Sequence, residues 1–186
     1  MSWAKATGKD KLIWSPYSGY DIQRPINPTE VVDHLLSHKY CGIANGRAEF
    51  GPRALGNRSL IADVRFDIQD TVNTIKRRQK YRPFAPAILE EFADEYFEGP
   101  MNEYMQFTSI AKHDYAPVTH VDGTARVQIV KKDCESVFRN VIEEYYERTG
   151  VPMLLNTSLN IRGEPMVNDR KDADRFELMY NVKVIS

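Results

Sequence analysis

The segment from residue 40 to residue 64 reads YCGIANGRAEFGPRALGNRSLIADV, with two short apolar runs on either side of a polar stretch that contains three glycines. The first run, Tyr40 to Ala44, and the second, Ser59 to Val64, are each typical of a short buried strand. The stretch between them carries arginines and tight-turn residues. We therefore expect two core strands of a sheet, joined by a long polar turn.

Helix signals lie on both sides of this segment. Asn27-Pro28-Thr29-Glu30 is a helix start, with Asn as N-cap, Pro at the first helical position and Glu at the third. Glu135 to Thr149 keeps a 3.6-residue apolar period, and Gly150 stands where a C-cap is expected. Further helices are expected over 70–79, 88–97 and 172–180, and further strands over 104–110, 125–130, 152–155 and 182–185. Because these elements do not alternate as βαβ units, the sequence predicts an α+β fold, a mixed twisted sheet flanked by helices.

Composition excludes several classes of protein. The chain has 186 residues, of which 42% are hydrophobic and 27% charged, and its net charge of −1 argues against a general nucleic-acid coat. No apolar run approaches the ~20 residues of a membrane helix, and the first residues lack the apolar stretch of a signal peptide. Two cysteines, Cys41 and Cys134, cannot build a disulfide framework. We expect a reduced, cytoplasmic protein.

Charge is unevenly distributed along the chain. Residues 42–82 hold seven Arg and two Lys against four acids, a net charge of +5, so the remainder carries −6. Residues 83–111 hold six acids and no base. Two interpretations stay open: solvated faces of opposite sign, or a pocket for polyanions, since guanidinium groups match phosphate geometry.

The polar turn Glu49 to Ser59 has two glycines five residues apart, as in a P-loop. A Walker A motif needs Gly-Lys-Ser/Thr, and this chain has Gly56-Asn57-Arg58-Ser59 instead, so we exclude it. Backbone N–H groups of such a turn, together with Arg53 and Arg58, are suited to an anion. The alternative is a tight turn whose arginines pair with Glu49 and Asp63.

A second basic motif spans residues 76–82, with five cations in seven residues before Pro83. Pro83 favours an extended conformation for Arg82 and ends any helix there. A basic helix end that leads into a rigid strand suits a phosphate clamp. The alternatives are a solvated basic face and a DNA-binding helix, which lacks the interleaved aromatic residues.

Two polar segments complete the set of candidate motifs. Residues 156–165 follow a buried strand, a position where loops often meet ligands, although Asn and Ser can also satisfy their own turn. Residues 119–126 contain an Asp-Gly turn and end on Arg126, another candidate cation. His34 and His38 have zinc-compatible spacing but no obvious third ligand, so we predict no metal site.

Together these four segments resemble the C-terminal, YrdC-like domain of the NodU/CmcH/TobZ family of O-carbamoyltransferases. The likeness spans roughly residues 14–184. It rests on Gly46 to Ser59, Arg82 to Pro86, His120 to Gln128 and Leu155 to Asn160, which occur in the order of the family. Residues 1–27 resemble the junction after an N-terminal transferase domain, and residues 28–186 the YrdC-like domain.

The resemblance implies that this domain forms carbamoyl adenylate from carbamoyl phosphate and ATP, with Mg²⁺ accompanying the nucleotide. A separate N-terminal transferase domain or subunit would then move the carbamoyl group to a hydroxyl acceptor. The residues implied as catalytic are Lys76, Arg82, Ser158 and Asn160. Those implied in carbamoyl phosphate or ATP binding are Arg53, Asn57, Arg58, Arg126, Asn156 and Arg162. Fixed Lys and Arg donors would stabilise the negative charge of the transition state, so positioning dominates over covalent chemistry.

Two other functions remain open from the sequence. One is a non-catalytic module that binds nucleotide or carbamoyl adenylate, or docks a transferase chain. The other is an RNA-binding domain of the same fold, against which the near-zero net charge and the lack of stacking aromatic residues argue.

Overall fold

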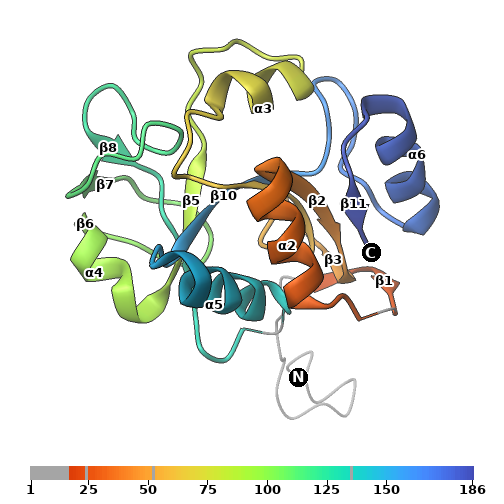
Figure 1. Cartoon of the computed structure of the whole chain (residues 1–186), viewed down its shortest axis with the longest axis horizontal. Coiled ribbons are helices and arrows are strands. Elements are labelled where there is room, and N and C mark those ends of the chain that lie inside the picture. Colours follow the sequence, from red (N-terminus) through yellow and green to blue (C-terminus); the bar gives the residue numbers. More distant parts are fainter. Residues whose placement is uncertain (1–16, 24, 52, 135) are drawn as a thin grey trace, which may run out of the picture.

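A six-stranded twisted sheet forms the centre of the computed structural model, which describes residues 17–186 except 24, 52 and 135. Its strands lie in the order β11-β2-β4-β10-β5-β9. Figure 1 shows β10 in the middle of the molecule, between the two ends of the sheet. The bounds are β2 Tyr40–Ala44, β4 Arg58–Ala62, β5 Ala85–Leu89, β9 Gln128–Val130, β10 Met153–Ser158 and β11 Val184–Ile185.

The sheet is mixed, as the sequence predicts. β10 pairs antiparallel with both β4 and β5, and β2 pairs antiparallel with β4. The outer pairs, β11 with β2 and β5 with β9, are parallel. The α+β class with a mixed sheet flanked by helices is therefore confirmed.

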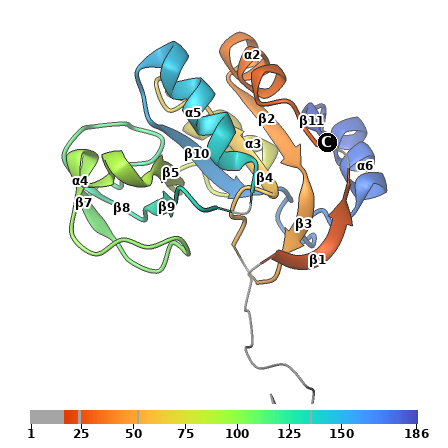
Figure 2. The ribbon, with the colours of Figure 1, turned by 90° about the horizontal axis from the view of Figure 1, so that it is seen from below.

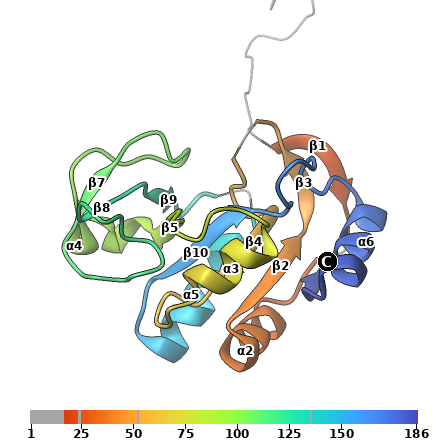
Figure 3. The same ribbon diagram turned by 90° about the horizontal axis from the view of Figure 1, so that it is seen from above.

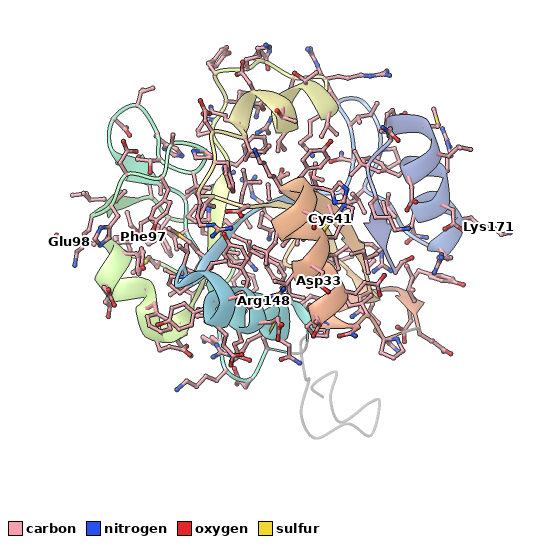
Figure 4. The ribbon with its side chains drawn as sticks, viewed as in Figure 1. Asp33, Cys41, Phe97, Glu98, Arg148 and Lys171 are labelled. Carbon is pink, nitrogen blue, oxygen red and sulfur yellow. The ribbon has the colours of Figure 1, made fainter. Side chains whose placement is uncertain are left out.

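Two helices, α2 (Pro28–His38) and α5 (Phe138–Thr149), pack on each other and on the sheet. Figure 2 shows them side by side over the strands. An ion pair of 2.7 Å between Arg148 Nη1 of α5 and Asp33 Oδ1 of α2 joins them at the surface (Figure 4). The predicted caps are confirmed: the Asn27 side chain accepts a hydrogen bond from Thr29 N, and Gly150 adopts a left-handed conformation after α5.

Smaller elements lie at the two ends of the sheet. A three-stranded sheet of β6 (Phe97–Glu98), β7 (Ser109–Ala111) and β8 (Thr124–Ala125) lies near α4 (Ala93–Tyr96) at one end. Helix α6 (Arg170–Tyr180) packs beside β11 at the other end. Figure 3 shows helix α3 (Gln69–Ile75) in front of the strands. In the described part of the chain, no helix is long and apolar enough to cross a membrane.

Several predicted boundaries were wrong. Residues Ile88 and Leu89 end strand β5, and only a short 3₁₀ turn (Glu90–Phe92) and α4 follow, because the apolar run is buried as a strand. The expected strand 104–110 is irregular until Ser109, where β7 begins. The expected strand 125–130 is divided between β8 and β9, which belong to different sheets. Helix α3 ends at Ile75 instead of residue 79, since Arg77 has a φ of 51° that no α-helix tolerates.

Part of the expected lead-in is a strand. Residues Tyr17–Ile22 form β1, which pairs antiparallel with β3 (Gly46–Glu49). Neither strand was predicted, because both segments are polar and their pairing is long-range. Residues 1–16 and Glu135, the predicted first residue of α5, lie outside the described part.

Candidate functional site

A cleft opens where the central strand β10 ends and its neighbours β4 and β5 begin. The register places Asn156 opposite Ala85, and Ser158 opposite Ser59, so three loops meet at this edge of the sheet. The cavity has a volume of about 340 Å³, within the ~300–1,000 Å³ of typical small-ligand sites. It is lined by Arg53, Ala54, Arg78, Arg82, Pro83, Phe84, Ala85, Met105, Arg126, Asn156, Thr157 and Ser158.

A second pocket of about 250 Å³ shares Arg78 and Arg82 with the cleft. Its other lining residues are Lys76, Gln79, Asn160, Ile161 and Arg162. Six cationic side chains thus surround the two pockets, and among the described residues that line them there is no Asp or Glu. Four separate segments of the sequence supply these cations, so the structure brings most of the predicted basic residues together.

The cations of the cleft affect one another through their charges. Burial, and then the charges of Arg82 and Arg126, lowers the pKa of Arg78 to about 10. Burial, and then the charges of Arg53 and Arg82, lowers the pKa of Arg126. Buried Nε of Arg126 has no hydrogen-bond partner in the described part of the chain. An anionic ligand would reduce the repulsion between these arginines and would give Arg126 Nε a hydrogen-bond acceptor.

Lys76 occupies a different position from the arginines. It is 5% exposed, and its Nζ donates to the backbone oxygens of Ser158 and Asn160, the latter at 2.8 Å. The Ser158 hydroxyl in turn donates to Asn160 Oδ1 at 2.6 Å. Burial, and then the charges of Arg78 and Arg82, lowers the pKa of Lys76 to about 7. The ammonium group therefore holds the loop 158–160 at the border of the two pockets.

Asn73 of α3, which the sequence analysis missed, organises the basic loop. It is fully buried, and its Nδ2 donates to the backbone oxygens of Lys80 at 2.8 Å and of Arg82 at 2.9 Å. Its Oδ1 accepts from Arg78 Nε, and the Arg78 guanidinium lies 4.0 Å from the centre of the Phe84 ring. The loop that carries three of the cations is thus held from a single buried carboxamide.

Arg53, in the turn between β3 and β4, and Arg58, the first residue of β4, were both predicted from the sequence to bind an anion, but the structure places them differently. Arg53 is exposed and lines the cleft. Arg58 is fully buried, and within the described part of the chain its guanidinium donates to backbone oxygens, among them those of Asn45 at 2.8 Å and Asn168 at 2.9 Å. The structure therefore does not bring Arg58 into the cleft with the other predicted ligand-binding cations, because its N–H donors join three separate segments of the chain.

Asn57 and Glu49 belong to the same structural network. The buried Asn57 side chain donates to the Arg47 oxygen at 2.8 Å and accepts from the Ser136 hydroxyl, so it too lies away from the cleft. Glu49 Oε1 accepts from the backbone N–H groups of Leu55 at 2.6 Å and Asn57 at 2.7 Å. The Glu49 carboxylate therefore caps the turn by accepting from backbone N–H groups, instead of pairing with an arginine side chain as one interpretation expected. The other expected acid, Asp63, pairs with Arg65 at 2.7 Å.

The described residues include no group of three or more His, Cys, Asp or Glu side chains placed to hold a metal ion. His34 and His38 stack on each other on α2, with ring centres 4.1 Å apart. Magnesium at the cleft would have only neutral protein oxygens available, such as those of Asn156 and Ser158. A divalent cation there would have to come with the phosphates of a nucleotide.

The family model described as the carbamoyltransferase C-terminus matches residues 32–185. The chain belongs to this family. It is 40% identical over 180 residues to the nodulation protein NolO of Bradyrhizobium diazoefficiens, a match that covers 91% of this chain and 32% of the relative. It is 34% identical over 182 residues to the 3'-hydroxymethylcephem-O-carbamoyltransferase of Amycolatopsis lactamdurans, covering 89% of this chain and 35% of that enzyme. The chain therefore spans about a third of the length of these relatives.

Solved structures resemble this carbamoyltransferase C-terminal domain in fold. HypF of T. kodakarensis superposes with a TM-score of 0.52 at 18% identity, covering 81% of this chain and 19% of HypF. A full-length HypF in its phosphate- and nucleotide-bound form gives a TM-score of 0.55 at 15% identity, over 91% of this chain and 22% of that one. At these identities the likeness shows the fold alone.

Asn73 and Arg78 are the residues of the carbamoyltransferase C-terminal domain that sequence reasoning missed in this site. Arg78 is part of the basic motif, but the sequence gives no reason to prefer it over the neighbouring cations as a ligand-binding residue. For Asn73 the one available signal was a carboxamide on the apolar side of a short helix, next to Val72. That signal does not reveal which distant backbone atoms the side chain meets.

Proposed function

We propose that this chain forms carbamoyl adenylate from carbamoyl phosphate and MgATP. One observation carries the proposal: six cationic side chains surround two adjoining pockets, and no carboxylate lies among the described lining residues. Such a site suits two polyanions at once, since each phosphate group brings charge that the guanidinium groups require. Membership of the carbamoyltransferase C-terminal family supports carbamoyl phosphate as one of them.

The balanced reaction consumes one water molecule. Hydrolysis of carbamoyl phosphate gives carbamate and phosphate, and a carbamate oxygen then attacks the α-phosphorus of ATP. The bond between the α-phosphorus and the bridging oxygen breaks, and pyrophosphate leaves with the electron pair. Negative charge accumulates on the α-phosphate and on the leaving group, and Arg53, Arg82 and Arg126, which line the cleft, would stabilise it.

In this proposal the protein contributes position and charge rather than a nucleophile. Lys76 keeps Ser158 and Asn160 in place through its backbone hydrogen bonds. Magnesium arrives with ATP and is held by phosphate oxygens and water. The carbamoyl group would pass to a hydroxyl acceptor on a transferase domain outside this chain, in keeping with relatives about three times as long.

The test is pyrophosphate release from MgATP, with and without carbamoyl phosphate, with carbamoyl adenylate sought by mass spectrometry. Release that depends on carbamoyl phosphate is expected. The Arg126→Ala variant should lower the rate about 100-fold, because it removes a fixed donor from the developing charge. Arg170→Ala, which removes an exposed arginine of α6 that pairs with Asp174, is the matched control and should leave the rate unchanged.

Other outcomes would favour the two alternative functions. MgATP binding without pyrophosphate release, under any carbamoyl phosphate concentration, would identify a binding module. Salt-dependent RNA binding without nucleotide binding would identify an RNA-binding domain.

A further inference from the structure

The Asn156 side chain carries an unpaired acceptor at the cleft. Asn156 lies on β10 and is 1% exposed, and its Oδ1 has no hydrogen-bond partner in the described part of the chain. Asn156 is also among the residues that line the cleft. A buried carboxamide oxygen without a donor is costly and uncommon, and at a residue that lines a cleft a ligand can supply the missing donor.

The orientation of this carboxamide is fixed by backbone atoms. Asn156 Nδ2 donates to the Ala54 oxygen at 3.1 Å and to Gln128 Oε1 at 2.6 Å. Gln128 Nε2 donates in turn to the Leu55 oxygen at 3.2 Å. If the oxygen and nitrogen of the Asn156 carboxamide exchanged positions, Oδ1 would face the Ala54 oxygen. If both carboxamides were exchanged in this way, Gln128 Oε1 would also face the Leu55 oxygen. Because a backbone carbonyl can only accept, Asn156 must present oxygen, and not nitrogen, as its unpaired atom.

The rest of the cleft offers mainly donors. Arg53, Arg82 and Arg126 line it, and buried Arg126 Nε is likewise unpaired. Among the described lining residues, a buried unpaired acceptor thus lies with cationic donors, a combination complementary to a ligand that has anionic oxygens and an N–H group beside them. Since Asn156 is almost fully buried, it suits a small terminal group rather than a ring system.

The geometry points to Asn156 as the residue that recognises the amino group of the carbamoyl substrate. Its Oδ1 accepts from the –NH₂ group, while Arg126 and its neighbours bind the carbonyl and phosphate oxygens. This assignment rests on the proposed function and deepens it, because it explains how the site would reject acyl phosphates that lack the amino group. A site built to pair with an N–H discriminates strongly against analogues without it.

Acetyl phosphate is the probe that tests this assignment. It has the charge and the approximate shape of carbamoyl phosphate, with a methyl group in place of the amino group. Dissociation constants of both compounds are measured by calorimetry on the unmodified chain. We expect carbamoyl phosphate to bind about 10- to 100-fold more tightly, the range for one buried hydrogen bond and the acceptor left unpaired without it.

Two variants separate recognition from general packing. Asn156→Ala should weaken carbamoyl phosphate binding until the two constants agree within about threefold, while acetyl phosphate binding stays near its original value. Ser59→Ala is the matched control: Ser59 Oγ is also buried and unpaired, but Ser59 is not among the residues that line either pocket. The ratio should be unchanged in this control.

The outcomes distinguish the assignment from the proposed function. Equal binding of both compounds by the unmodified chain would overturn the assignment alone. Binding of neither compound would overturn the proposed function, and the assignment with it. An Asn156→Ala variant that loses both compounds equally, or that loses only MgATP, would show a packing or nucleotide-binding role instead.

Discussion

Replacement of Arg58 by lysine tests whether this arginine has a structural role or binds nucleotide. Arg58 is fully buried, and six hydrogen bonds from its guanidinium reach five backbone oxygens. These oxygens belong to Tyr20, Asn45, Gly46, Asn57 and Asn168. They come from β1, from the segment before β4 and from the segment before α6, so one side chain joins three parts of the chain.

The magnitude follows from counting donors. Lysine keeps the charge but has three N–H donors where arginine has five. Asn57 O also accepts from the Asn45 N–H at 3.0 Å, so at least one of the other four backbone oxygens must lose its donor, at about 1–3 kcal/mol for each acceptor left buried. We therefore expect a loss of about 1–3 kcal/mol in the free energy of unfolding. For a chain of this length that is a fall in Tm of roughly 2–12 °C.

The assay pairs thermal unfolding with MgATP binding measured well below the Tm. Arg58→Lys should lower the Tm and leave the dissociation constant for MgATP within about twofold. Arg126→Lys, at the cleft, is the matched control and should show the reverse: a Tm near that of the unmodified chain and weaker MgATP binding. An Arg58→Lys protein with an unchanged Tm and tenfold weaker MgATP binding would refute the structural assignment.

Two further predictions concern the turn before β4 and the buried lysine. Gly56→Ala should destabilise the chain about 1–3 kcal/mol more than Gly51→Ala in urea unfolding: both glycines have φ near +120°, at +120° and +127°, but only at Gly56 would the added Cβ overlap the Phe138 side chain. Equal destabilisation would show that backbone strain alone matters there. MgATP binding at about pH 8 should take up most of one proton, because the pKa of Lys76, lowered to about 7 by burial and neighbouring arginines, rises when a polyanion binds. Calorimetry in buffers of different ionisation enthalpy measures this uptake, and Lys76→Met should abolish it.

Most of the central sheet could be predicted from the sequence. β2 was predicted with its observed bounds, β4 and β11 to within two residues at each end, and β10 to within one residue at its start and three at its end. These strands are short apolar runs bounded by turn residues, so their signal is local. The predictions failed where one apolar segment fits two kinds of element. Ile88 and Leu89 have helical spacing with Phe92, but in the structure they form the end of strand β5.

The candidate site was predictable as a set of segments but not as a set of contacts. Arg53, Arg82, Arg126, Asn156 and Ser158 all line one cleft, and four stretches far apart in the sequence bring them there. No single segment of the sequence shows which of these side chains form hydrogen bonds with the protein itself. Lys76, for example, lines the second pocket, and its side-chain nitrogen also donates to the loop 158–160, a contact that no local pattern predicts.

By itself the sequence determined most strands of the central sheet, the N-cap of α2, the C-cap of α5 and the chemistry available at each loop, since all of these depend on neighbours within a few residues. The tertiary structure decided which of these side chains bind to the protein itself and which line the cleft. Arg53 and Arg58 lie five residues apart in one turn with the same side chain, and only one is free to meet a ligand. The difference arises because β1 and the segment before α6, distant in sequence, bury Arg58 beneath backbone oxygens. Desolvation and hydrogen-bond partners depend on such long-range neighbours, so they become fixed only when the chain folds.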